Sequence, residues 1–110
     1  MITFTIYNHN KTIVGFESKG HAGYAESGHD IICAAVSILT QNTVDCIKSF
    51  TDDKYDFYQN DKDAHIRFIL KNTDSPGDDA VLLLKSLKNG MMALVMGDGS
   101  EYIDLFFKEV

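Results

Sequence analysis

Alternation of apolar and polar residues marks two hairpins and a last strand. Residues 2–7 and 12–17 alternate and are rich in β-forming side chains, and the four residues between them can turn, which predicts a hairpin. A second hairpin is predicted from residues 55–60 and 64–71, and a final strand from residues 101–109. The chain is therefore expected to form five strands.

Two other segments repeat their apolar residues every three or four positions, as one face of a helix does. The first predicts a helix over residues 30–49, with Asp30 as its N-cap and an apolar stripe of Ile32, Val36, Leu39, Thr43, Cys46 and Phe50. The second predicts a helix over residues 77–96, with a stripe of Ala80, Leu84, Leu87, Met91, Leu94 and Val95. We expect an α+β fold in the order β-β-α-β-β-α-β, an antiparallel sheet with two helices packed on one face.

Length and charge narrow the class of protein. The 110 residues predict one domain, 1–110, and the net charge of −6 argues against a nucleic-acid partner. No stretch of the chain looks apolar enough for a membrane helix, and the first ten residues do not resemble a signal peptide. Two cysteines are too few for a disulfide scaffold. We therefore expect a cytoplasmic protein with both thiols reduced.

The segment 18–29 has no periodicity and contains Gly20, Gly23 and Gly28, so it predicts a loop. Loops this long in small domains are often functional. The glycines allow unusual backbone conformations, and we expect residues 20–29 to be mobile without substrate.

Cys33 is the candidate nucleophile. With Asp30 as N-cap, Cys33 is the third residue of the helix, where free N–H groups and the helix dipole favour a thiolate. Cys46 is instead on the apolar stripe, which predicts a small buried side chain. A nucleophilic cysteine needs an imidazole as general base, and both His21 and His29 are near in sequence.

A metal site is an alternative to the catalytic interpretation, and two other histidines need no functional role. A metal site could use His21, His29, Asp30 and Cys33, but Asp30 would already cap the helix and no second cluster completes the set. His9 is expected to be a turn residue and His65 an exposed strand residue.

The stretch GHAGYAESGHDIICAAVSIL resembles the signature of the bacterial ribosomal-processing cysteine protease family, Prp. That signature is Gly-His-Ala, a variable stretch, and then Gly-x-Asp followed by two β-branched residues and Cys-Ala, with Ser close behind. The matching residues are Gly20, His21, Ala22, Gly28, Asp30, Ile31, Ile32, Cys33, Ala34 and Ser37. Chain length and element order also fit this family.

The resemblance implies that Cys33 is the nucleophile and His21 the general base, so it selects His21 over His29. Asp30 and Ser37 would be supporting residues. Gly20, Ala22, Gly23 and Gly28 would belong to the loop that meets the substrate.

The family's activity implies removal of a short N-terminal extension from large-subunit ribosomal protein number twenty-seven, after a hydrophobic stretch that often contains Phe. It also implies a homodimer with no metal or organic cofactor. Charge and hydropathy, as above, predict no direct contact with nucleic acid or membrane. The alternative is a non-catalytic protein that binds a peptide or assists ribosome assembly.

Overall fold

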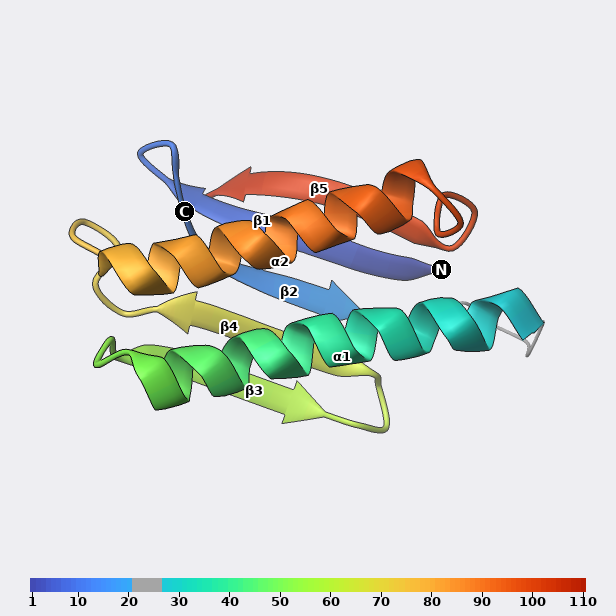
Figure 1. Cartoon of the computed structure of the whole chain (residues 1–110), viewed down its shortest axis with the longest axis horizontal. Coiled ribbons are helices and arrows are strands. Elements are labelled where there is room, and N and C mark those ends of the chain that lie inside the picture. The colour runs from blue at the N-terminus through green and yellow to red at the C-terminus, as the bar shows by residue number, and fades with distance from the viewer. Residues whose placement is uncertain (21–26) are drawn as a thin grey trace.

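The structure is a computed structural model that describes residues 1–20 and 27–110, with side chains for residues 1–20 and 31–110. Five strands and two helices follow one another in the predicted order. The strands are β1 (Ile2–His9), β2 (Thr12–Lys19), β3 (Tyr55–Asn60), β4 (His65–Leu70) and β5 (Ile103–Glu109). The helices are α1 (Ser27–Phe50) and α2 (Asp78–Met96), and both lie on the same face of the sheet (Figure 1). The α+β prediction is confirmed.

The sheet is mixed, so the prediction of an antiparallel sheet is wrong at one edge. Its strand order is β3-β4-β2-β1-β5, and β5 pairs with β1 in parallel, with Ile2 opposite Ile103. The reason is the crossover through α2, which returns the chain to the end of the sheet where β4 began. A strand that follows such a crossover runs parallel to β4, and β4 runs parallel to β1 because each is antiparallel to β2.

The core lies between the sheet and the two helices. Its centre is a stack of three phenylalanines from neighbouring strands: Phe16 lies between Phe4 and Phe68, with ring centroids 5.8 and 5.9 Å away. The helix α2 adds Ala80, Leu84, Leu87 and Met91, which are all buried. The predicted stripe of this helix is confirmed, because these four positions face the sheet.

The buried face of α1 differs from the predicted stripe at its C-terminal end. The buried residues are Ile32, Val36, Thr40, Thr43, Val44 and Ile47. Phe50 is 73% exposed, and Cys46 is half-buried outside the core cluster. Burial of Thr40 was not expected from periodicity; its hydroxyl donates to the carbonyl oxygen of Val36 at 2.9 Å, which satisfies the polar group. The prediction that Cys46 is a core residue is wrong.

One segment of α1, residues 31–50, is long and apolar enough to cross a membrane on length and composition alone. The same composition is found in helices that cover a core. Here Ile32, Val36 and Ile47 pack into the core, whereas Ile31, Ile38 and Phe50 are exposed. The expectation that no stretch is apolar enough to span a membrane is therefore wrong by this criterion.

Candidate active site

A cavity of about 280 Å³ lies beside the N-terminal half of α1, where β2 ends and β4 begins. It is lined by residues of α1, of β1 and β2, and of the β3–β4 hairpin: Ile2, Ser18, Gly20, Cys33, Val36, Ser37, Thr40, Gln41, Gln59, Asp61, Ala64, His65 and Ile66. Three of the residues predicted from the sequence, Gly20, Cys33 and Ser37, line it together. The cavity is large enough for one large side chain of a peptide, and its wall is both apolar and polar.

Cys33 is placed by the helix that carries it. It follows the buried Ile32 and is itself half-buried, packed against the edge of the core cluster. Ser37 is four residues later, so both side chains lie on the same side of α1. A sulfur at the wall of a cavity can reach a peptide bound there, and a hydroxyl one turn away adds a hydrogen-bonding group to the same wall.

The helix begins three residues earlier than predicted, so Asp30 is not its N-cap. α1 starts at Ser27, which makes Asp30 the fourth helical residue and Cys33 the seventh, in the second turn rather than the first. The field of a helix N-terminus weakens beyond the first turn, so the predicted effect of free N–H groups on Cys33 is wrong. The extra turn is polar and extends past the sheet, where a helix needs no apolar stripe (Figure 1).

The predicted loop is correspondingly shorter, because β2 extends to Lys19 and α1 includes Gly28. His21, Ala22 and Gly23 lie outside the described residues, and so does the expectation of a mobile loop for residues 21–26. The side chains of His29 and Asp30 are likewise outside the described part.

Gly20 is the last described residue before that segment, and its backbone is specific for glycine. Its φ is +91°, and a Cβ there would lie 2.8 Å from the carbonyl oxygen of Met1. L-residues with a side chain rarely adopt such a φ. Since Gly20 also lines the cavity, the backbone next to His21 is fixed at the edge of the Cys33 site.

Cys46 is in a different environment from Cys33. Its thiol donates to Oδ1 of Asn42 at 3.7 Å, and Cys46 does not line the Cys33 cavity. Neither cysteine forms a disulfide. The two thiols therefore differ in their position relative to the cavity, which only Cys33 lines, and not in burial, since both are half-buried.

One polar network beside the cavity was missed by the sequence interpretation. His65, predicted to be exposed, is half-buried, and its Nε2 lies 2.6 Å from Oε2 of Glu17. The hydroxyl of Tyr7 donates to the other oxygen of Glu17 at 3.0 Å. Burial would raise the pKa of Glu17, but the hydrogen bonds from His65 and Tyr7 outweigh it and lower that pKa. Alternation shows only which residues of one strand share a face. The register between β2 and β4 brings Glu17 close to His65.

The family model described as cysteine protease Prp matches residues 1–104. The chain belongs to this family. A ribosomal processing cysteine protease Prp of Staphylococcus aureus is 32% identical over 88 residues, which cover 79% of this chain and 81% of the relative. The Bacillus subtilis protein of the same name is 42% identical over 48 residues, 43% of each chain.

Solved structures agree with the family assignment. A crystal structure of the S. aureus Prp protease in complex with a substrate peptide superposes with a TM-score of 0.87, at 27% identity, over 98% of this chain and 100% of that one. A second structure, with a covalently linked product peptide, gives a TM-score of 0.85 at 28% identity, over the same shares of the two chains. The resemblance to the Prp family is confirmed, and this member is a cysteine protease.

The metal alternative depends on three side chains, of His21, His29 and Asp30, that are outside the described residues. Among the side chains that are described, no three His, Cys, Asp or Glu residues gather as a metal site requires.

Proposed function

We propose that this Prp family member is an endopeptidase of ribosome maturation that uses Cys33 as its nucleophile and His21 as its general base. The observation that carries the proposal is the position of Cys33, the signature cysteine, at the wall of the cavity. Its S. aureus relatives are named ribosomal processing proteases, and one was solved with a substrate peptide. The substrate we propose is the N-terminal extension of large-subunit ribosomal protein number twenty-seven.

The proposed reaction has two steps. The thiolate of Cys33 attacks the scissile carbonyl carbon, the C–N bond breaks, and the leaving amine takes the proton held by His21. Water then attacks the thioester, giving its proton to His21; the C–S bond breaks, the carboxylic acid product leaves, and the Cys33 thiolate with protonated His21 is restored. The covalently linked product peptide in the S. aureus relative agrees with such covalent catalysis.

The cavity also supports a preference for a hydrophobic residue near the cleaved bond. Ile2, Val36 and Ile66 supply an apolar wall, and Gln41, Gln59 and Asp61 are polar groups of the same cavity. A pocket of this kind holds an apolar side chain, while a few polar groups orient the backbone of the peptide.

The test is single-turnover cleavage of a peptide that carries the ribosomal-protein junction, followed by mass spectrometry. Cys33→Ala and Cys33→Ser should abolish cleavage, and Cys46→Ala is the matched control because that thiol is away from the cavity. His21→Ala should slow cleavage by roughly 10²–10⁴-fold, and His29→Ala much less. Cleavage by Cys33→Ala at a rate near wild type would refute the protease mechanism and favour the non-catalytic peptide-binding alternative.

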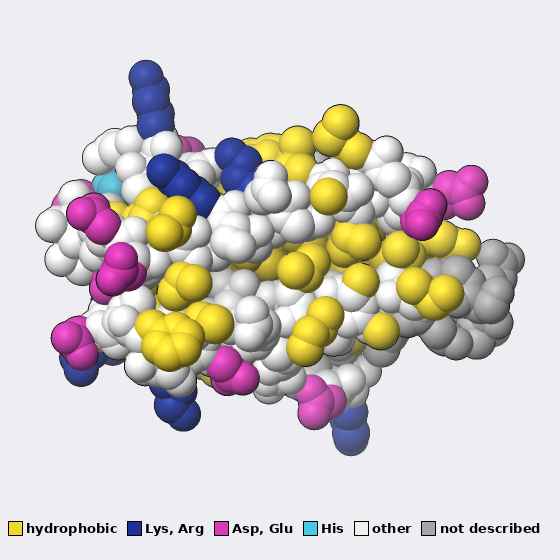
Figure 2. Space-filling model, viewed as in Figure 1, with side chains coloured by type: hydrophobic (Ala, Val, Ile, Leu, Met, Phe, Trp, Pro, Cys, Tyr) yellow, Lys and Arg dark blue, Asp and Glu magenta, His cyan; other side chains and the backbone are white. Residues whose placement is uncertain are grey.

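We also propose a cytoplasmic homodimer, since ribosomal proteins are made and processed in the cytoplasm. Exposed apolar side chains support self-association: Phe106 and Phe107 on the edge strand β5 are 53% and 52% exposed. Figure 2 shows further hydrophobic side chains along the face formed by the two helices. Ile38 of α1 and Met96 of α2 are among the exposed large hydrophobic residues. Sedimentation at micromolar concentration should give twice the monomer mass of 12.3 kDa, and a monomer mass would refute the dimer.

A further inference from the structure

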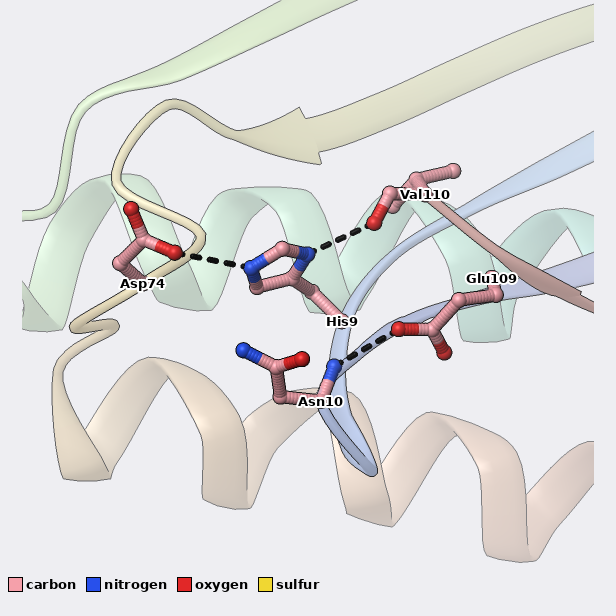
Figure 3. Close-up of polar contacts among 5 residues, drawn as sticks. All are labelled: His9, Asn10, Asp74, Glu109 and Val110. Carbon is pink, nitrogen blue, oxygen red and sulfur yellow. Dashed lines mark hydrogen bonds and ion pairs between the residues drawn. The ribbon is translucent and has the colours of Figure 1, made fainter.

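The histidine at the end of β1 joins three parts of the chain that are far apart in sequence. His9 is followed by a tight turn in which Asn10 and Lys11 both have positive φ, of 49° and 69°. Its Nδ1 lies 2.6 Å from the main-chain oxygen of Val110, after β5, and its Nε2 lies 2.8 Å from Oδ1 of Asp74, between β4 and α2 (Figure 3). The imidazole thus points to one partner on each side.

Both of these partners can only accept hydrogen bonds. Neither the main-chain oxygen of Val110 nor the carboxylate oxygen of Asp74 carries a proton to donate, so each ring nitrogen of His9 must supply an N–H. A neutral imidazole has one N–H and can satisfy one partner; an imidazolium has two and satisfies both. The geometry in Figure 3 is therefore that of the protonated ring.

The backbone already brings the end of β5 close to His9. The N–H of Val110 donates to the carbonyl oxygen of Asn8 at 2.9 Å, and the N–H of Asn10 donates to Oε1 of Glu109 at 2.8 Å. His9 adds the connection before α2, through Asp74, to this junction. Loss of either ring N–H would leave one of the two segments without its bond to His9.

We propose that His9 is a proton-dependent clasp, which ties both the end of β5 and the β4–α2 connection to the β1–β2 turn when charged and releases one of them when neutral. The clasp is at the end of the sheet near the chain's C-terminus, whereas the β3–β4 turn beside the Cys33 cavity is at the opposite end (Figure 1). It would control local order at one end of the sheet without contacting the active site.

The surrounding charges favour the protonated ring. The hydrogen bond to the main-chain oxygen of Val110 and then that to Asp74 raise the pKa of His9 above 6.5; burial opposes this, and the charges of Asp74 and Glu109 add to it. The other charged groups nearby are Lys11 of the turn and, from α2, Asp78, Asp79 and Lys85, which line a hollow together with Asp74. Because the pKa is raised on folding, the clasp is complete below pH 6.5 and is lost as the pH rises through the raised value.

The experiment is an NMR titration of the full chain, which follows the His9 ring signals together with the backbone amides of Asn10, Asp74 and Val110. In the wild type, His9 should titrate above 6.5, and the chemical shifts of these amides should change with the same midpoint. Asp74→Asn removes the bonded carboxylate and should lower the His9 midpoint. Asp78→Asn removes the same charge nearby without touching His9, so it should leave the midpoint close to that of the wild type.

Two outcomes would overturn the clasp. One is a His9 midpoint at or below 6.5 in the wild type; the other is an equal effect of Asp74→Asn and Asp78→Asn, which would show general electrostatics instead of a bond. His9→Gln, which cannot be protonated in this range, should also remove the pH dependence of the Val110 amide. Peptide cleavage by Asp74→Asn should equal that of the wild type.

Discussion

Substitution of Gly20 by alanine tests whether the backbone that leads into the active-site segment is as constrained as its geometry indicates. Gly20 has a φ of +91°, follows β2 and lines the Cys33 cavity. The carbonyl oxygen of Met1 would be 2.8 Å from the new Cβ, which is closer than ordinary van der Waals contact. Either the backbone at position 20 or the first residue of the chain has to move.

The expected cost follows from these two effects. A left-handed conformation costs an L-residue about 1–2 kcal/mol, and strained positions of this kind cost about 1–3 kcal/mol in all. Because Met1 is at the start of the chain, its movement limits the part of this cost that comes from the steric clash. Gly20→Ala should therefore lower the free energy of unfolding by about 1–3 kcal/mol. Gly20→Asn should cost less than Gly20→Val, because Asn tolerates positive φ and a β-branched residue does not.

Urea unfolding followed by far-ultraviolet circular dichroism measures this cost, with an expected decrease of the midpoint of about 0.5–2 M. Gly90→Ala is the control: Gly90 is inside α2, and the atoms nearest to its new Cβ belong to the flexible side chain of Leu39, at 3.1 Å, which has to shift by a few tenths of an ångström. Helix propensity favours that change by up to about 1 kcal/mol. Peptide cleavage by Gly20→Ala should also be slower, because the residue lines the Cys33 cavity. A Gly20→Ala protein within about 0.5 kcal/mol of wild type would refute the reasoning.

Three further changes test the fold and its charges. Phe16→Ala should lower the free energy of unfolding, measured in urea, by about 3–5 kcal/mol, because the ring is fully buried between two others. Phe57→Ala is the control and should cost far less, because Phe57 is 42% exposed on the edge strand β3. Similar costs for the two variants would contradict the described core. Gly28→Ala should not reduce stability, since Gly28 is inside the first turn of α1, and a loss above about 1 kcal/mol would show that the helix starts later. Folding lowers the pKa of Glu17, so its carboxylate stabilises the folded state fully at pH values above its ordinary pKa of 4.5. This stabilisation is lost as the pH falls through the lowered pKa. Glu17→Gln should therefore flatten the acid limb of a plot of stability against pH, and an unchanged limb would exclude this role.

Local pattern was enough to find the elements of this protein and its most informative residue. Alternation and helical period gave the order of the strands and helices, because both depend only on which side chains near in sequence share a face. The stripe of α2, from Ala80 to Met91, was correct for the same reason. The signature around Cys33 identified the family, and the comparisons confirmed it.

Features that depend on distant parts of the chain were decided only by the tertiary structure. The parallel pairing of β5 with β1 results from a crossover that passes over two other strands. The local pattern of a strand does not show which position it takes in the sheet. The bond between Glu17 and His65 depends on the register of β2 and β4, and the contacts of His9 join residues 65 and 101 positions apart. The start of α1 at Ser27 escaped prediction because a polar turn that extends past the sheet buries nothing and so leaves no apolar pattern in the sequence.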